Sequence, residues 1–241
     1  MNICIVGGTG YVGLVTGLGF AEIGNNVINV DIDQKRIHRL QNGDSPIYEE
    51  RILPVLRRNL DACRIQVSSD LRSAIASSQA IFIAVGTPSR EDGQADLSQV
   101  IQVASELARY VNSYKVIVIK STVPVGTVEL VRSMLCREKV EGQDFDIVAN
   151  PEFLREGNGL YGFFYPDRIV IGVRSEKAGS IMTRLYQPIV KGEVIGVNGW
   201  SNPRTGIPVP MVGTDFASAQ MIKYASNTFL AIRISFIDFL H

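Results

Sequence analysis

The sequence has few cysteines. Three occur among 241 residues, and no two of them stand at the spacing of a metal-binding pair. No secretory leader precedes them, so the scattered thiols indicate a reduced, cytoplasmic location, with neither a disulfide framework nor a metal site. We therefore expect Cys4, inside a predicted strand, and Cys136, near the end of a predicted helix, to be packing residues.

The sequence also has no excess of positive or negative charge and no long apolar run. Lys and Arg total 24, and Asp and Glu total 24, so no net field attracts nucleic acid or an anionic membrane surface. No uninterrupted apolar run reaches the roughly 18 residues of a membrane-spanning helix. We expect the partners to be small molecules or other protein subunits, with no nucleic acid and no membrane.

Residues 2–31 are the most informative stretch. A short apolar run, Ile3 to Val6, leads into the turn GGTGYVG and then into small and apolar residues at helical spacing. A second apolar run ends at Asp31, roughly 20 residues past the glycines, as the dinucleotide-binding fingerprint requires. The order of strand, turn, helix, strand and acid favours a dinucleotide site over a glycine turn with a purely structural role.

Each residue type in that turn has a physical task. We expect Gly8 to allow the tight turn, Gly10 to let the backbone approach a pyrophosphate, and Gly13 to let the helix pack closely on the sheet. The N–H groups at the start of the helix, among them those of Tyr11 and Val12, favour an anion together with the positive end of the helix dipole.

Asp31 indicates which dinucleotide binds. Its carboxylate is suited to accept hydrogen bonds from ribose hydroxyls, and its charge would repel a 2′-phosphate, which favours NAD over NADP. Lys35 and Arg36 follow closely and keep NADP open, although both also fit a solvated helix face. We count Lys35 among the candidate cofactor-binding residues.

Beyond Asp31, apolar runs of strand type alternate with segments of helical periodicity as far as about residue 212. The expected strands are 64–67, 80–85, 116–119, 145–149, 168–173, 193–197 and 209–212, and the expected helices are 34–41, 51–60, 71–77, 97–111, one ending near 135, and 176–186. This alternation predicts an α/β fold, with a doubly wound, mostly parallel Rossmann-like sheet in residues 1–212. The Gly/Pro/Asn-rich residues 198–208 are predicted to form a loop.

Loops that follow the predicted strands should meet at the edge of the sheet where such folds bind ligands. Gly86 and Thr87 follow one buried strand, and we expect them to contact the cofactor, the alternative being an ordinary Gly-Pro loop. Residues 213–241 are predicted to be a long final helix capped by Thr214 and Asp215. Its apolar residues exceed what one packed face needs, so we expect the chain to end inside a helix that continues or has a partner.

Seven strings, in this order, carry a family resemblance: GTGYVGL (8–14), PIYE (46–49), VGTP (85–88), KSTVPVGT (120–127), NPEFLREG (150–157), PDRIVIG (166–172) and KYASN (223–227). In these strings the sequence resembles the nucleotide-sugar dehydrogenases of the UDP-glucose/GDP-mannose dehydrogenase family. The resemblance implies oxidation of the C6 alcohol of UDP-glucose to a carboxylate by two hydride transfers to two NAD molecules, a step of nucleotide-sugar metabolism and polysaccharide biosynthesis. A family cysteine traps the aldehyde as a thiohemiacetal, and water hydrolyses the thioester that follows.

The same resemblance assigns catalytic roles to five residues. Thr122 and Glu152 would position water and substrate, and Glu156 would lie beside the cofactor as the base for thioester hydrolysis. Lys223 would stabilise the developing oxyanion, and Asn227, four residues further along the helix, would hold the same oxygen or its water. Thr122 and Glu156 also count as cofactor-binding candidates. Taken singly, each residue equally fits a structural or solvated role.

The sequence departs from the family in several places. The family's cysteine lies in a string G-x-G-x-G-G-x-C beyond the long helix, and neither that string nor the second, UDP-binding domain occurs in these residues. We therefore expect this polypeptide alone to bind NAD without completing the oxidation. Gln220 stands where the family often has an acid, which removes one possible charge partner of Lys223. Nothing in the sequence gives Gly159 and Gly162 a functional role.

Two alternatives stay open. The sugar nucleotide could be GDP-mannose or a UDP-N-acetylhexosamine, since few substrate contacts fall in these residues. The chain could also be a non-catalytic NAD-binding fragment that forms a homodimer through its terminal helix, which in the family links the domains and forms the dimer core.

Overall fold

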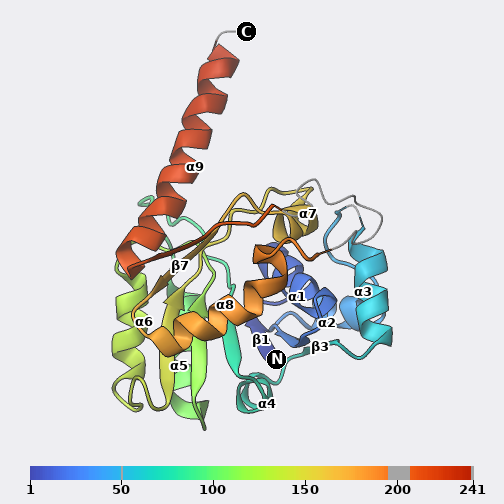
Figure 1. The fold of residues 1–241 in the computed structure, drawn as a ribbon, viewed down its shortest axis with the longest axis vertical. Coiled ribbons are helices and arrows are strands. Elements are labelled where there is room, and N and C mark those ends of the chain that lie inside the picture. Colours follow the sequence, from blue (N-terminus) through green and yellow to red (C-terminus); the bar gives the residue numbers. More distant parts are fainter. Residues whose placement is uncertain (50, 195–206, 240–241) are drawn as a thin grey trace.

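The computed structural model describes residues 1–49, 51–194 and 207–239. Its strands are β1 (Asn2–Val6), β2 (Asn26–Val30), β3 (Ile65–Ser68), β4 (Ala80–Ile83), β5 (Lys115–Ile119), β6 (Phe145–Ala149), β7 (Ile169–Val173) and β8 (Met211–Thr214). Its helices are α1 (Tyr11–Glu22), α2 (Gln34–Gln41), α3 (Ile52–Asp61), α4 (Leu71–Ser77), α5 (Ser98–Tyr110), α6 (Thr127–Leu135), α7 (Gly159–Phe164), α8 (Glu176–Val190) and α9 (Phe216–Phe239). Figure 1 shows their arrangement.

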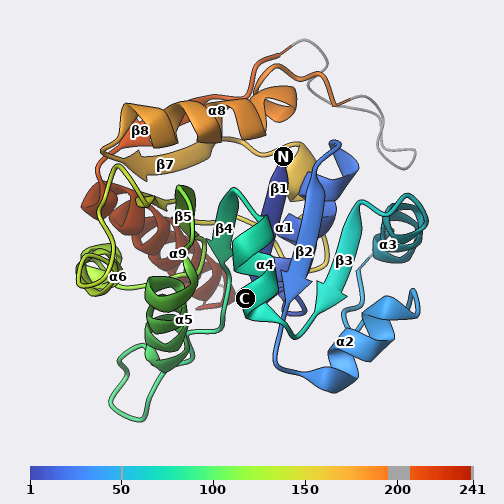
Figure 2. The same ribbon diagram turned by 90° about the horizontal axis from the view of Figure 1, so that it is seen from below.

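The described strands form one sheet in the order β3-β2-β1-β4-β5-β6-β7-β8. Neighbours from β3 to β6 run parallel, so the carboxyl ends of β1, β4, β5 and β6 share one edge. The order reverses between β1 and β4, which is the switch point where doubly wound sheets bind ligands. The predicted fold class is therefore confirmed, with β3 and β8 at opposite ends of the sheet (Figure 2).

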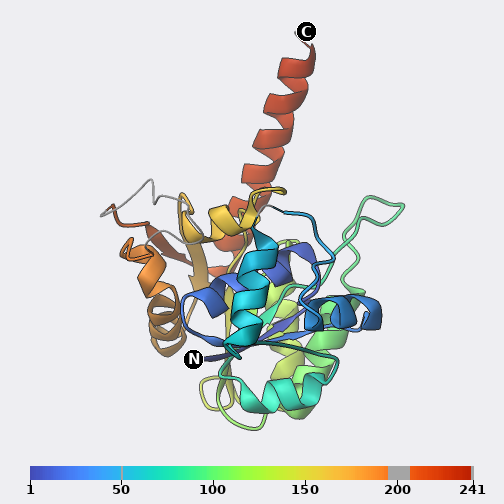
Figure 3. The same ribbon diagram turned by 90° about the vertical axis from the view of Figure 1, so that its right-hand side faces the viewer.

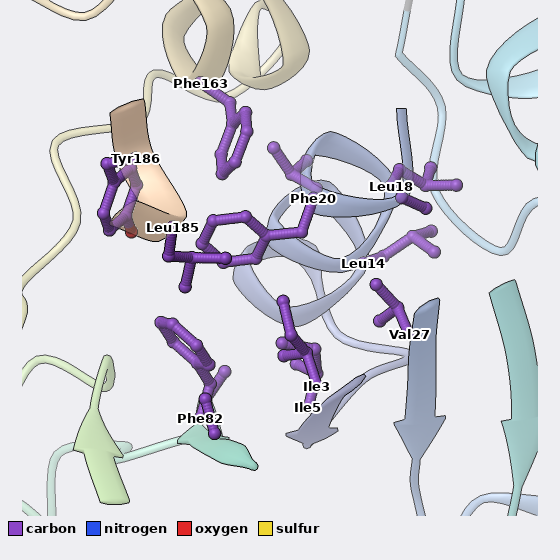
Figure 4. Packing of buried hydrophobic residues seen from close by; sticks show 14 of the residues in the cluster. Ile3, Ile5, Leu14, Leu18, Phe20, Val27, Phe82, Phe163, Leu185 and Tyr186 are labelled. Carbon is purple, nitrogen blue, oxygen red and sulfur yellow. The ribbon is translucent and has the colours of Figure 1, made fainter. Parts of the chain in front are cut away.

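Helices cover both faces of the sheet (Figure 3), and each face has its own apolar core. One core joins the sheet to α1, α2, α3, α7 and α8, and the other joins it to α4, α5, α6 and the start of α9. In the first core, the Phe20 ring of α1 lies 5.1 Å from both Phe82 of β4 and Phe163 of α7, and 5.2 Å from Tyr186 of α8 (Figure 4). These aromatic contacts fix α7 and α8 on the same side of the sheet as α1.

Some of the predicted elements differ in the structure. The short helix α7 was not expected, because its sequence GLYGFF contains two glycines, yet Phe163 and Phe164 are buried in the core and hold it there. The helix α8 continues to Val190, four residues beyond the predicted end. Residues 193 and 194 are not in a strand, and the rest of the predicted strand 193–197, like most of the loop 198–208, lies outside the described residues.

Two further differences concern β7 and a cysteine. β7 runs antiparallel to β6 and pairs in parallel with β8, so the described sheet contains one antiparallel pair of strands. Cys4 is buried in β1 as expected, but Cys136 is exposed at the end of α6, so the prediction that it packs in the core was wrong. The apolar face of α6 is supplied by other residues, and the helix has already ended at Leu135.

The last helix projects away from the sheet (Figure 1). Asp215 accepts a hydrogen bond from the Ser218 N–H at 2.8 Å, as its predicted capping role requires. Only Phe216, Ala219, Gln220 and Lys223 of α9 are buried, while its large apolar residues from Phe229 onward are more than half exposed. Among the described residues, no helix is long and apolar enough to cross a membrane. The division into units 1–212 and 213–241 stays a prediction.

Candidate active site

The glycine turn after β1 is packed tightly on its neighbours. Gly7 has a φ of +80°, so the left-handed residue of the turn is Gly7, one position before the glycine expected to allow it. A Cβ on Gly8 would lie 2.6 Å from the Asn29 Cβ, and one on Gly13 would lie 2.1 Å from the Gly7 carbonyl oxygen. Gly8 therefore lets the turn approach β2, and Gly13 lets α1 pack on the turn.

The start of α1 is suited to an anion. A Cβ on Gly10 would meet only the Gly7 carbonyl oxygen at 3.4 Å, which leaves room over the turn. Gly10 is the N-cap of α1 and offers no side-chain acceptor, and the first turn holds no acid. The N–H groups at Tyr11 and Val12 thus keep their capacity to donate to a phosphate. An open turn and an uncapped helix start fit the pyrophosphate of a dinucleotide.

Asp31 is tied to the same turn. Its Oδ2 accepts hydrogen bonds from the Thr9 backbone N–H at 3.0 Å and from the Thr9 hydroxyl at 2.7 Å. Its Oδ1 accepts from the backbone N–H groups of Ile32 at 2.8 Å and Asp33 at 3.2 Å. The carboxylate at the end of β2 is therefore fixed beside the glycine turn, while Lys35 is exposed in the first turn of α2.

The loops after β4 and β5 are joined by their hydroxyl groups. The Thr87 hydroxyl donates to the Thr122 carbonyl at 2.7 Å, and the Ser121 hydroxyl donates to the Val85 carbonyl at 2.7 Å. Gly86 is exposed, with no heavy atom within 4 Å of an added Cβ. The structure thus brings Thr87 and Thr122 together at the expected edge of the sheet.

Glu152 and Lys223 form an enclosed ion pair. Lys223 Nζ lies 2.9 Å from Glu152 Oε1, and the two side chains are only 6% and 11% exposed, respectively. The Glu152 carboxylate also accepts a hydrogen bond from the Leu154 N–H. Because a charged side chain without a partner is costly to bury, the burial of each of these two side chains depends on the charge of the other. The pair joins the loop after β6 to α9, across 71 positions of sequence.

Glu156 and Asn227 lie outside this pair. Both residues are exposed, Glu156 four residues past Glu152 in the same loop and Asn227 about one turn past Lys223 on α9. Among the described residues, neither side chain is hydrogen-bonded to Glu152 or Lys223. Of the five expected catalytic residues, the structure therefore places two in direct contact and leaves Glu156 and Asn227 open to solvent.

Lys120 is a charged group of this site that the sequence analysis did not single out. It directly follows β5 and is buried, and its Nζ donates to Asn150 Oδ1 at 3.2 Å. Burial lowers the pKa of Lys120 to about 8; the nearby Glu152 carboxylate opposes this shift and the Lys223 ammonium adds to it. A lysine at a buried strand end, inside the KSTVPVGT string, was the available signal.

Gln220 has a different role from the one expected. It is buried on the same side of α9 as Lys223, and its Oε1 accepts from the Gly126 N–H at 3.2 Å. Its Nε2 donates to the Pro124 carbonyl at 2.7 Å. The amide thus fastens the KSTVPVGT loop to α9, a task that needs a donor and an acceptor, while Glu152 serves as the charge partner of Lys223.

A cavity of about 420 Å³ lies beside the ion pair. Its walls include Thr16, Lys120, Asn150, Glu152, Arg155 and Tyr186. The Thr16 hydroxyl is fully enclosed and has no hydrogen-bond partner among the described residues. The walls of the cavity therefore combine acidic, basic and amide side chains, as those of a site for a hydroxylated ligand would.

A mostly parallel sheet, with a turn suited to an anion at its switch point, defines a dinucleotide-binding domain of Rossmann type. The family model for the UDP-glucose/GDP-mannose dehydrogenase family, NAD binding domain, matches residues 1–190. The chain belongs to this family. Its sequence is 45% identical, over 231 residues, to the UDP-glucose 6-dehydrogenase TuaD of Bacillus subtilis, and 42% identical to a UDP-glucose 6-dehydrogenase of Rhizobium meliloti.

Solved structures show the same fold. A UDP-glucose dehydrogenase from Pyrobaculum islandicum superposes with a TM-score of 0.84 at 37% identity, and a GDP-mannose dehydrogenase from Pseudomonas aeruginosa with 0.85 at 28% identity. These matches cover 97% and 99% of this chain but 50% and 52% of theirs, and the Bacillus match covers 96% of this chain and 46% of TuaD. The chain thus spans about half the length of these relatives.

Proposed function

We propose that this chain provides the cofactor-binding half of a UDP-glucose 6-dehydrogenase, which oxidises the C6 alcohol of UDP-glucose to UDP-glucuronate. The observation that carries the proposal is the enclosed Glu152–Lys223 pair. Glu152, which accepts from Lys223 of α9, follows β6 at the same edge of the sheet as the glycine turn after β1. Relatives named UDP-glucose 6-dehydrogenase, at 42% and 45% identity, support the choice of sugar.

The residues that would hold NAD fall into three groups along this edge. The turn and helix start would hold the pyrophosphate, the end of β2 and α2 would hold the adenosine ribose, and the loops after β4, β5 and β6 would face the nicotinamide. In that order they are Gly8, Gly10, Tyr11, Val12 and Gly13; Asp31 and Lys35; and Gly86, Thr87, Thr122 and Glu156. When bound, NAD supplies the hydride acceptor.

The chain's own side chains would do the remaining work. Lys223 would donate hydrogen bonds to the sugar oxygen as negative charge develops on it, in a site from which water is largely excluded. Glu152 would hold that ammonium in place and, with Thr122, orient water and substrate. Glu156 would take a proton from the attacking water, and Asn227 would be a second donor to the same oxygen.

We propose that none of the three thiols in these residues traps the aldehyde. Cys4 is enclosed in β1, where burial raises its pKa to about 12, so it is not a thiolate near neutral pH. Cys63 and Cys136 are exposed, at the ends of α3 and α6. The trapping cysteine implied by the family resemblance would come from the glycine-rich string that these residues do not contain.

A second candidate keeps the fold and changes the sugar. The GDP-mannose dehydrogenase superposes as well as the UDP-glucose dehydrogenase does, and a UDP-N-acetyl-mannosamine dehydrogenase from Staphylococcus aureus superposes with a TM-score of 0.80. A third candidate, a non-catalytic NAD-binding homodimer, is favoured by the exposed apolar residues of α9. We propose a cytoplasmic location in each case.

Calorimetric titration of the purified chain with NAD, NADP and UDP-glucose tests the first proposal. We expect NAD to bind at least about tenfold more tightly than NADP, a difference of about 1.4 kcal/mol, because of Asp31. The variant Asp31→Asn should reduce that preference. Binding of NADP in preference to NAD would contradict the role of Asp31, and binding of neither would overturn the cofactor site. Titration of the NAD-loaded chain with both sugar nucleotides tests the second candidate, which binding of GDP-mannose but not of UDP-glucose would favour.

A further inference from the structure

Three segments that are far apart in sequence meet at the buried carboxylate of Glu49. The Tyr11 hydroxyl donates to Glu49 Oε2 at 2.6 Å, and the Leu160 N–H donates to Glu49 Oε1 at 2.6 Å. The Tyr11 hydroxyl is also 2.8 Å from the Arg155 carbonyl, a second acceptor. Tyr11 is the first residue of α1, and Leu160 lies in the first turn of α7, which packs on α1 (Figure 1). We call Tyr11, Glu49, Gly159 and Leu160 the Glu49 clasp.

The clasp explains a glycine that the sequence analysis could not. A Cβ on Gly159 would lie 2.6 Å from the Tyr11 hydroxyl oxygen and 3.0 Å from Glu49 Oε2. Gly162, in the same helix, differs, because its Cβ would meet only Leu154 Cδ2 at 3.8 Å. The absence of a side chain at Gly159 is therefore what allows the tyrosine and the carboxylate to meet under α7.

The hydrogen bonds of the clasp should be strong. Glu49 is only 8% exposed, and a buried carboxylate requires donors to offset its lost hydration. Burial, together with the Glu49 carboxylate, raises the pKa of the Tyr11 hydroxyl, so the hydroxyl keeps its proton as a donor. The loss of either donor leaves the carboxylate under-satisfied inside the protein.

The clasp connects two parts of the proposed active site. Tyr11 begins the helix expected to face the pyrophosphate, and the segment 152–156, with Glu152 and Glu156, ends three residues before Gly159. We propose that Tyr11 and Glu49 are positioning residues, which hold the segment 152–160 against the dinucleotide turn and couple NAD binding to the order of that segment. This inference depends on the proposed NAD site.

Amide hydrogen exchange at Leu160 tests the coupling, because this N–H donates directly to Glu49. In the unchanged chain, saturating NAD should slow exchange at Leu160 by about tenfold relative to the NAD-free chain. In Tyr11→Phe, measured at its own saturating NAD concentration, the slowing should fall below about twofold. Tyr110→Phe, in α5 on the other side of the sheet, should behave as the unchanged chain does.

The outcomes separate the two ideas. A Tyr11→Phe variant that binds NAD and keeps the full slowing at Leu160 would overturn the coupling alone, because a purely structural tyrosine leaves that ratio unchanged. Failure of the unchanged chain to bind NAD would overturn the cofactor site and the coupling together.

The two glycines of α7 provide an independent test. Gly159→Ala should destabilise the chain and speed exchange at Leu160, whereas Gly162→Ala should do neither. Combining Gly159→Ala with Tyr11→Phe removes the hydroxyl that the new methyl group would strike, so the double variant should lose less stability than the two single losses added together. Equal effects of the two glycine substitutions would contradict the clasp.

Discussion

Glu152 and Lys223 form an ion pair that is enclosed inside the protein. Each side chain is at least 89% enclosed, and their contact at 2.9 Å offsets the loss of hydration on both sides. An ion pair of this kind contributes little net stability compared with a well-packed apolar pair, but the loss of one partner leaves a buried charge. The pair also fixes the Lys223 ammonium group at a defined position in the site.

Lys223→Met should therefore lower the free energy of unfolding by about 3 kcal/mol, because it leaves Glu152 buried and unpaired. The double variant Lys223→Met with Glu152→Gln should recover much of this loss. Lys191→Met is a matched control, since Lys191 is half exposed and lies 3.7 Å from an equally exposed Glu193. Urea unfolding of the four proteins measures the differences, and equal losses at Lys223 and Lys191 would contradict the enclosed pair.

Lys120 gives the stability a characteristic pH dependence. Its pKa is about 8 in the folded chain against an ordinary value of 10.5, so from pH 8 upward the folded chain releases a proton that the unfolded chain keeps. The free energy of unfolding should then rise by about 2 kcal/mol between pH 8 and pH 9.5, at about 1.4 kcal/mol per pH unit.

Lys120→Met should lose this rise, and the difference between the two pH profiles isolates Lys120 from other groups. Below about pH 7 the lysine is protonated in both states and contributes no slope. Parallel profiles for the two proteins between pH 8 and pH 9.5 would show that Lys120 keeps an ordinary pKa.

At the scale of elements, α9 and the loop after β5 hold each other. Gln220→Ala removes an acceptor from Gly126 and a donor from Pro124, so we expect a loss of about 1–2 kcal/mol of unfolding free energy and faster exchange of the Gly126 amide. Gln187→Ala, on an exposed position of α8, should change neither. Unchanged exchange at Gly126 in the Gln220 variant would refute the fastening role.

The sequence predicts most elements, because their signals are local. Strand 145–149 and helix 34–41 match the structure residue for residue, since the strand is a mostly apolar run and the helix is flanked directly by Asp33, which caps its start, and by Asn42 and Gly43, which favour its end. The helix α7 has no comparable local signal, because two glycines lower its helical propensity and contacts with distant parts of the chain stabilise it, among them those of Phe163 with α1 and α8 and of the Leu160 N–H with Glu49. The reversed direction of β7 likewise depends on how the chain crosses α7, which no local pattern encodes.

The site shows the same division. Strings such as NPEFLREG and KYASN identify Glu152 and Lys223 as residues of interest, but their pairing spans 71 positions and follows only from the packing of α9 on the sheet. From the sequence, Gln220 differs from the family only by the absence of an acidic charge. In the structure its amide accepts a hydrogen bond from the Gly126 N–H and donates one to the Pro124 carbonyl, which an acid could not do as well.

At the scale of the whole molecule, the outer part of α9 exposes an apolar surface. Phe229, Ile232 and Phe236 are at least 60% exposed, which is unusual for an isolated helix. We expect the chain to dimerise through this surface, and Phe229→Asp with Phe236→Asp to shift it to the monomer. Sedimentation velocity over a range of concentrations measures this, with Thr228→Asp on the same helix as the control. A monomer at every concentration would contradict the dimer.

The helix α9 contacts the sheet at its start only and projects away from it (Figure 1). Its first turns are held against the sheet as far as Ser226, whose hydroxyl accepts a hydrogen bond from Arg168 at 3.2 Å, and residues 227–239 extend roughly 20 Å further at 1.5 Å per residue. Because Lys223 lies on the same rigid helix, we expect a change in the direction of this exposed part to rotate Lys223 relative to Glu152. We therefore expect a partner that binds the exposed end of α9 also to determine the orientation of the Lys223 ammonium group.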